Sequence, residues 1–258
     1  MRFPKGDGAA TVRAPGLGDT GPVPDPLVTL TLWGVAPRHV PQAAARMALD
    51  RRHLRRAPGL RFAKLLGTGS GRTFTPRDAD PRHWGLLAVW ADAAARDDFA
   101  TSPTARAWDR LRTEQLTVTM TPIASRGLWS RRAPFGDPVP RRTEGPVAAI
   151  TRARLRLTRA RSFRAAVPAV SADLGTSAGL RFAVGIGEAP VGLQGTFSLW
   201  DDAASLTAFA HGRAAHRDVA ARTARERWYA EELFARFAVL SVSGTFDGHD
   251  PLPGPRGS

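Results

Sequence analysis

The sequence contains no cysteine and only two lysines, at positions 5 and 64. Without cysteine the chain forms no disulfide, offers no thiolate ligand and has no cysteine nucleophile, so histidines and carboxylates must supply any metal ligands. The sequence also lacks an uninterrupted run of about 18 apolar residues, so no membrane-spanning helix is expected.

The basic charge comes almost entirely from arginine, and the formal net charge is +14. Such an excess can indicate nucleic-acid binding. Here the arginines are scattered along the chain rather than gathered in one stretch, so we expect no nucleic-acid partner. Peripheral contact with an anionic membrane surface remains compatible with the charge, because basic residues near such a surface are attracted to it.

The 258 residues are enough for one large or two small domains. Residues 1–26 are rich in glycine and proline and show no periodicity, so we expect a disordered N-terminal arm. This arm has no apolar segment of signal-peptide length, and a cytoplasmic protein is therefore expected.

Residues 27–125 read as one βαββαβ unit, because alternating strand patterns and helical patterns follow one another in that order. The expected strands are 27–33, 60–66, 83–90 and 116–123, and the expected helices are 37–57 and a second one after Asp92 that Pro103 divides. The glycines at 67, 69 and 71 fit neither the spacing of a P-loop nor that of a dinucleotide-binding loop.

The same order restarts after an Arg- and Pro-rich linker at residues 126–145, and a second unit spans 146–248 before a tail at 249–258. The expected strands are 147–157, 180–186, 193–200 and 238–246, and the expected helices are 162–174, 201–209 and 213–237.

Two short sequences recur in both units. GLRFA begins at Gly59 and again at Gly179, and a tryptophan followed by an acidic, alanine-rich segment begins at Trp90 and at Trp200. We therefore predict an α+β protein of two tandem ferredoxin-like (βαββαβ) halves that form a single-chain dimeric αβ-barrel, as a monomer or homodimer. The cavity between the two sheets is the expected ligand site.

Five stretches, at residues 59–80, 125–136, 145–156, 181–202 and 216–237, occur in the order in which the spheroidene monooxygenase family of carotenoid oxygenases has them. The chain resembles that family over most of residues 28–247. The resemblance implies an O2-dependent monooxygenase of the dimeric αβ-barrel kind that uses haem.

Two histidines are candidates for the axial ligand of a haem iron. His216 has no histidine counterpart in the first half, as expected if only one half kept a cofactor site, and together with the family resemblance this makes it the expected metal ligand. His211 is the alternative. Five positions on a helix turn a side chain by about 500°, so the two histidines cannot both bind one metal from an unbroken helix.

Four further residues are candidates for the site. Gln194 and Trp200 share one face of an expected strand, so Gln194 would hydrogen-bond substrate or bound oxygen and Trp200 would form a cavity wall, unless Trp200 is simply core. Arg181 would face a haem propionate or lie solvated at a strand edge, and Lys64 would contact an acidic group in the cavity or extend to its edge.

The leading hypothesis is a haem-dependent monooxygenase that hydroxylates or oxidises an apolar small molecule, carotenoid-like or another secondary metabolite, with b-type haem and O2. The electron donor is not indicated by the sequence. A cofactor-free oxygenase or isomerase of the same barrel type is the first alternative, and a non-catalytic barrel that binds haem or an apolar ligand is the second.

Overall fold

The computed structural model describes residues 26–72, 76–159, 162, 174–188, 195–212 and 228–253. Almost all of the expected N-terminal arm and of the expected helix at 162–174 lies outside this part of the chain. In chain order the described elements are β1 (Leu27–Val35), η1 (Pro37–His39), α1 (Val40–Leu54), β2 (Leu60–Gly69), η2 (Pro76–Asp78), β3 (Ala79–Trp90), α2 (Ala93–Ala100), α3 (Pro103–Asp109), β4 (Arg112–Gly127), β5 (Val147–Leu155), η3 (Leu157–Arg159), β6 (Leu180–Gly187), β7 (Gly195–Trp200), α5 (Ala203–Gly212) and β8 (Tyr229–Gly244).

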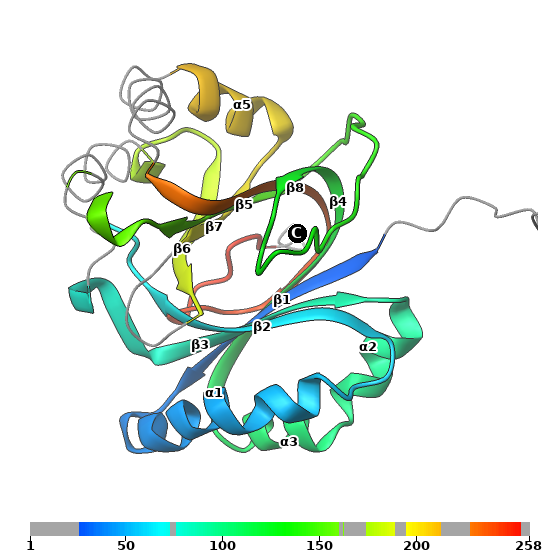
Figure 1. Ribbon diagram of the computed structural model, residues 1–258, viewed down its shortest axis with the longest axis vertical. Coiled ribbons are helices and arrows are strands. Elements are labelled where there is room, and N and C mark those ends of the chain that lie inside the picture. The colour runs from blue at the N-terminus through cyan, green and yellow to red at the C-terminus, as the bar shows by residue number, and fades with distance from the viewer. Residues whose placement is uncertain are drawn as a thin grey trace, which may run out of the picture.

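The eight strands form one closed antiparallel barrel in the order β1-β3-β2-β6-β7-β5-β8-β4 (Figure 1). Each half contributes four neighbouring strands in the same relative order, β4-β1-β3-β2 and β8-β5-β7-β6. The long strands β4 and β8 pair along most of their lengths, whereas β2 and β6 pair only from Gly67 to Gly69. The barrel is therefore closed tightly at the junction of β4 and β8 and over only a short stretch at the junction of β2 and β6.

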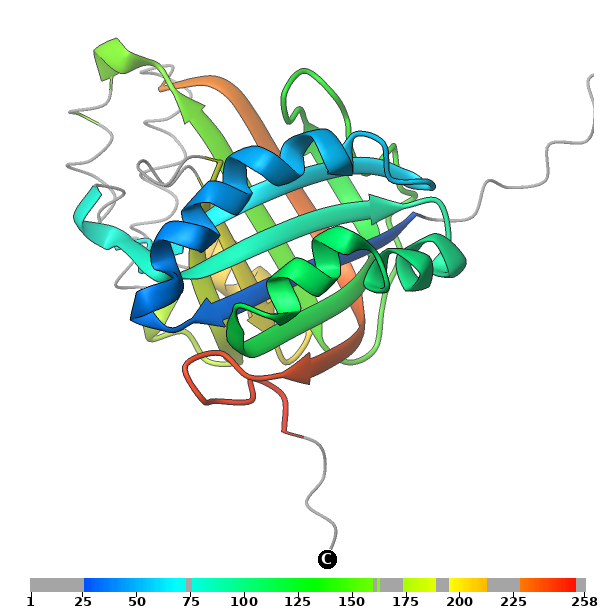
Figure 2. The same ribbon diagram turned by 90° about the horizontal axis from the view of Figure 1, so that it is seen from below.

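The helices lie on the outside of the barrel. Figure 1 shows α1, α2 and α3 on one side of the strands and α5 on the other, and Figure 2 shows the first three lying across the strands of the first half. Asp92 caps α2 and Ser102 caps α3, each by accepting a hydrogen bond from a backbone N–H, as the division at Pro103 predicts. In the described part of the chain, no helix has both the length and the apolar character needed to cross a membrane.

Alternate side chains of every strand point into the barrel, where they form one apolar core. Each strand contributes a buried member, namely Leu30, Leu66, Leu87, Val118, Ile150, Ile186, Phe197 and Phe237. The interior is thus occupied by side chains over much of its length, which is what an eight-stranded barrel allows. The open cavity between two sheets that the sequence led us to expect is therefore largely filled.

The recurring GLRFA sequence has a structural reason. Gly59 and Gly179 have φ values of +68° and +77°, and each carbonyl accepts a hydrogen bond from the backbone that follows β3 or β7. A Cβ atom on Gly59 would lie 2.3 Å from the Cβ of Ala95, and one on Gly179 would lie 2.4 Å from the Oγ of Ser205. Both glycines allow the start of a strand to approach a helix closely.

Two segments differ in detail from what the sequence led us to expect. The helix expected to reach residue 237 is replaced from Tyr229 onward by β8, which alternates Leu233, Ala235 and Phe237 into the interior. The segment expected to be only a linker contributes Trp129 and Phe135 to the same core, each 1% exposed. Pairing with β4 and β5 on its two sides stabilises β8 despite its helix-forming residues.

Candidate functional site

One end of the barrel, where β1 begins, carries a pocket of about 460 Å³. Its walls include the core residues Phe62, Val89 and Phe135, and its rim includes Arg61 and Asp137. The segment at 132–138 forms one side of this pocket, so part of the expected linker shapes a mouth that leads to the apolar core.

A group of charged side chains points inward from several strands, close to the same segment. Lys64 donates to Glu188 Oε2 over 2.5 Å and to Ser130 Oγ over 2.6 Å. Glu188 Oε1 accepts from Trp129 Nε1 over 2.7 Å and from Arg152 Nη2 over 2.9 Å. Lys64 therefore does contact an acidic group, and the contact joins the first half of the chain to the second.

Arg152 and Glu231 form the most deeply buried ion pair of this group, with side chains 5% and 7% exposed. Glu231 also accepts hydrogen bonds from the backbone N–H groups of Ser130 and Arg131, both of which have positive φ values. Burial alone would raise the pKa of the Glu231 carboxyl, but these hydrogen bonds and the Arg152 charge outweigh it and lower that pKa.

The pKa of the Glu188 carboxyl is lowered for the same kind of reason. Burial opposes ionisation, and the hydrogen bonds from Lys64 and Trp129 together with the charges of Lys64 and Arg152 more than offset it. The Nε atom of Arg152 is buried, and none of the described residues provides it with a hydrogen-bond partner. We refer to Lys64, Trp129, Ser130, Arg152, Glu188 and Glu231 as the Lys64 network.

Trp200 lies on the opposite side of the barrel wall from this network. It is fully buried in a small outer cluster with Val147 and Leu206, and its Nε1 donates to Ser198 Oγ over 2.9 Å. Phe197, on the other face of β7, points into the interior, as the alternation predicts. Trp200 therefore packs between β7 and α5, and it does not line the interior.

The two halves differ in side-chain size on this outer face. The strand registers show which residues occupy equivalent positions in the two halves. Leu65 corresponds to Gly185, Leu86 to Thr196, and Trp33 to Ala153. The three first-half side chains are buried against helices and belong to a large apolar cluster. At the second-half positions the side chains are small, but the backbone of Gly69–Gly71 packs over two of them. A Cβ atom on Gly185 would lie 2.9 Å from Gly71 N, and one on Gly71 would lie 3.6 Å from Thr196 Cγ2.

The remaining candidates are only partly described by the structure. Arg181 lies on the outer face of β6, where its guanidinium pairs with Asp201, and its side chain is 49% exposed. His211 is in the last turn of α5, but the placement of its side chain is not described. Gln194 and His216 lie outside the described residues. The structure thus brings Lys64 into the interior and keeps Trp200 and Arg181 outside.

The sequence reasoning missed Arg152 and Glu231. The signal for Arg152 was available, because it continues the inward alternation of Ala148 and Ile150 along an expected strand, where a charged side chain needs a partner. Glu231 was missed because its segment was expected to be a helix.

The sequence Gly-Thr-Ser-Ala-Gly at 175–179 has the spacing of a hydrolase nucleophile elbow, but it precedes β6 instead of following a strand.

Comparison with known proteins gives relatives at the level of sequence. The chain is 37% identical over 219 residues to spheroidene monooxygenase of Rhodobacter capsulatus, which covers 83% of this chain and 89% of that protein. It is 38% identical over 193 residues to spheroidene monooxygenase of Rubrivivax gelatinosus, covering 74% of this chain and 73% of that protein. No family model matches the chain.

Among solved structures, two crystal structures of aldoxime dehydratase share the fold. They superpose with TM-scores of 0.53 and 0.52 at 12% and 13% sequence identity, and each match covers 83% of this chain. These similarities support the mixed α+β architecture of the chain and carry no information on its substrate.

Proposed function

Because the chain belongs to the spheroidene monooxygenase family and is a monooxygenase, we propose that it hydroxylates or oxidises an apolar, carotenoid-like molecule with O2 and a bound haem. The observation that supports the cofactor most directly is a difference in side-chain size between the outer faces of the two halves, since Ala153 lies where the first half has Trp33. Haem is a broad, flat and largely apolar group, and it needs a space that large side chains do not fill.

The second-half outer face has features that fit such a group. Ala153 lies where the first half has Trp33. Gly69–Gly71 packs against Gly185 and Thr196 on one side of it. Trp200 and α5 close another side, with 5.3 Å between the ring centroids of Trp200 and Phe209. His211 lies in the last turn of α5. Haem bound here would supply the activation of O2, and the protein would supply a water-poor surrounding and fix the orientation of the substrate.

The site residues keep their proposed roles on this face. His216 would hold the haem iron, and His211 is the alternative. Trp200 would form the wall beneath the haem, Gln194 would hydrogen-bond substrate or oxygen, and Arg181 would pair with a propionate in place of Asp201. Lys64 has no place in this set, because its ammonium already pairs with Glu188 on the inner side of the wall.

The substrate proposal rests on the pocket at the end of the barrel. Its walls of Phe62, Val89 and Phe135 suit an apolar chain, and Arg61 at the rim suits a polar end group. We also propose that the chain consists of two tandem ferredoxin-like halves, which the identical strand order of the two halves supports. A cytoplasmic location remains a prediction.

An absorption spectrum of the protein purified from haem-supplied cells tests the cofactor. We expect a Soret band that is lost in His216→Ala and kept in His53→Ala, a control at a half-exposed histidine of α1. Loss of the band only in His211→Ala would exchange the ligand. A wild-type protein without the band even after reconstitution would refute haem dependence and favour the cofactor-free alternative. Oxygen consumption with reductant and a carotenoid separates catalysis from simple binding.

A further inference from the structure

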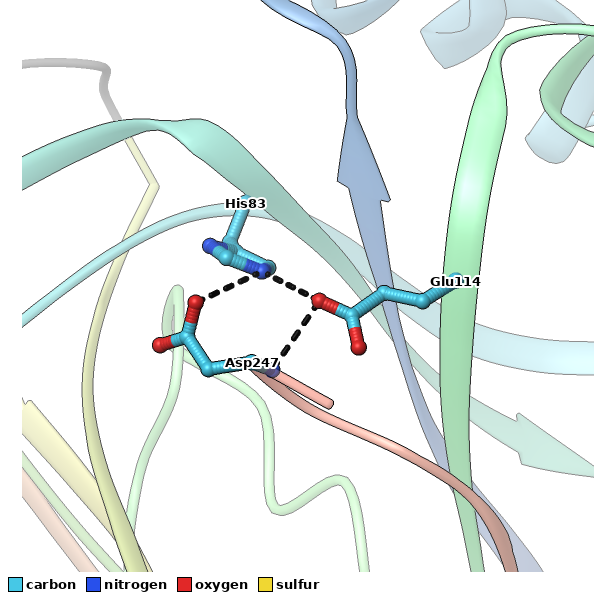
Figure 3. A group of neighbouring side chains, drawn as sticks. All are labelled: His83, Glu114 and Asp247. Atoms are coloured by element: carbon cyan, nitrogen blue, oxygen red, sulfur yellow. Dashed lines mark hydrogen bonds and ion pairs between the residues drawn. The ribbon is translucent and has the colours of Figure 1, made fainter. Parts of the chain in front are cut away.

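Three ligand-type side chains meet at the end of the barrel where β1 ends. His83 of β3, Glu114 of β4 and Asp247, which follows β8, point toward one another (Figure 3). The Nε2 atom of His83 lies 3.0 Å from Glu114 Oε1 and 3.8 Å from Asp247 Oδ1. One donor atom from each residue lies within 4.8 Å of the other two.

The strand between β3 and β4 is shaped to allow this approach. Gly34 of β1 pairs with His83 on one side and with Glu114 on the other. A Cβ atom on Gly34 would lie 2.7 Å from Glu114 Cγ and 3.1 Å from His83 Nε2. Glycine at this position therefore gives the imidazole and the carboxylate the space to face each other directly.

A fourth residue orients the imidazole. The Oδ2 atom of Asp80 lies 2.6 Å from His83 Nδ1, while Nε2 faces the other two carboxylates. With the proton held on Nδ1 by Asp80, the lone pair of Nε2 points to where a cation would sit. This carboxylate–histidine arrangement is the one that commonly supports metal-binding histidines.

Three acceptor positions of Glu114 are used by other groups, and the fourth faces His83 Nε2, where a cation would lie between the two. Its Oε2 accepts from the hydroxyl of Thr245 and the N–H of Gly248, each over 3.0 Å. Its Oε1 accepts from the N–H of Asp247 over 2.9 Å, which leaves the lone pair that faces His83. A carboxylate has about four such positions, so three are used and the fourth points into the cluster.

The charges of the cluster are unbalanced. Asp80, Glu114 and Asp247 surround a single imidazole, and the charge of Arg82 also acts on Asp80. Even with the imidazole protonated, the negative charges outnumber the positive ones. This excess occurs in a chain whose net charge is +14, and a bound cation would offset it.

We propose that His83, Glu114 and Asp247 bind one divalent first-row transition-metal ion, such as Zn²⁺ or Mn²⁺, at a site separate from the haem. One imidazole nitrogen and two carboxylate oxygens form a donor set that such ions accept without thiolate. Ligand bonds of about 2.0–2.2 Å place neighbouring donor atoms about 3–3.5 Å apart. The two distances from His83 Nε2, 3.0 and 3.8 Å, lie in or near that range.

The ion would fasten the segment after β8 onto β3 and β4. Phe246, next to Asp247, stacks on the His83 ring with 4.2 Å between centroids and also packs against the interior core. The segment thus closes this end of the barrel, and the ion holds it there. Its role is structural and does not depend on the monooxygenase proposal.

Isothermal titration of the full, tag-free chain with ZnCl₂ or MnCl₂ tests the site. The key variant is Asp247→Asn, because this side chain is 58% exposed and its backbone N–H still donates to Glu114. We expect one ion per chain and at least a tenfold weaker affinity in Asp247→Asn. Asp97→Asn, at an exposed carboxylate of α2, is the matched control and should bind as the wild type does.

The melting temperature, measured with and without the ion, distinguishes loss of the site from a folding defect. The ion should raise the melting temperature of the wild type and of Asp97→Asn, and it should raise that of Asp247→Asn much less. Absence of binding to the wild type at millimolar metal would overturn the proposal. Binding of equal affinity to Asp247→Asn would overturn it too, since the ion would then lie elsewhere, for example at His211.

Discussion

Substitution of Glu231 by glutamine tests the most buried part of the Lys64 network. The change removes the negative charge that pairs with Arg152, whose side chain is 5% exposed, and weakens the acceptor for two backbone N–H groups. Breaking a buried ion pair on one side typically costs about 3–5 kcal/mol. Glu188 still holds the Nη2 atom of Arg152 at 2.9 Å, so we expect a loss near the lower end, about 3 kcal/mol.

Urea unfolding followed by tryptophan fluorescence measures this loss. The matched control is Glu232→Gln, because the neighbouring side chain points to the other face of β8 and its substitution should change stability by no more than about 0.5 kcal/mol. Equal effects of the two substitutions, or a loss below about 1 kcal/mol for Glu231→Gln, would refute the reasoning.

The same network predicts how stability depends on pH. The pKa values of Glu231 and Glu188 lie below their ordinary value of 4.5 in the folded chain. Their contribution is therefore fully present above pH 4.5 and is lost as the pH falls through the lowered folded pKa values. We expect the wild type to lose stability on acidification in this range, and Glu231→Gln to lose less.

Two further predictions concern the first half. Gly59→Ala and Gly136→Ala both place alanine at a φ of +68°, which costs about 1–2 kcal/mol. Only the new Cβ of Gly59→Ala meets another atom, the Cβ of Ala95 at 2.3 Å. Thermal unfolding should therefore show Gly59→Ala to be less stable than Gly136→Ala by at least about 1 kcal/mol, and equal losses would contradict the packing argument. Trp108→Phe removes the N–H that donates to the fully buried Asp50 over 3.1 Å. Urea unfolding should show that the free energy of unfolding falls by about 1–3 kcal/mol. An unchanged unfolding midpoint would mean that another donor replaces the indole N–H.

Local signals in the sequence predicted much of the fold. Alternation identified β1 and β7, Asp92 identified the start of α2, and the paired GLRFA sequences identified equivalent strands whose first glycine has a positive φ. The start of β8 was missed because Glu231 and its neighbours favour a helix locally. Pairing with β4 and β5, which no local pattern reveals, determines the outcome.

The candidate site was harder to predict, because its geometry depends on which face of each strand is enclosed. The alternation correctly placed Phe197 and Trp200 on opposite faces, but the sequence did not show that the Phe197 face is the interior. His83, Glu114 and Asp247 could not be grouped at all. Glu114 is 31 positions from His83 and 133 from Asp247, and only the strand order brings them together.

The haem content of Thr196→Leu tests most directly the claim that the outer face of the second half holds the cofactor. The substitution installs the residue type that the first half has at Leu86, and Thr31→Leu on the outer face of β1 is the control. The account predicts a folded Thr196→Leu protein that binds haem at least tenfold more weakly than the control, with a somewhat lower melting temperature because the larger side chain meets Gly71. A Thr196→Leu protein with the full Soret absorbance of the wild type would contradict it.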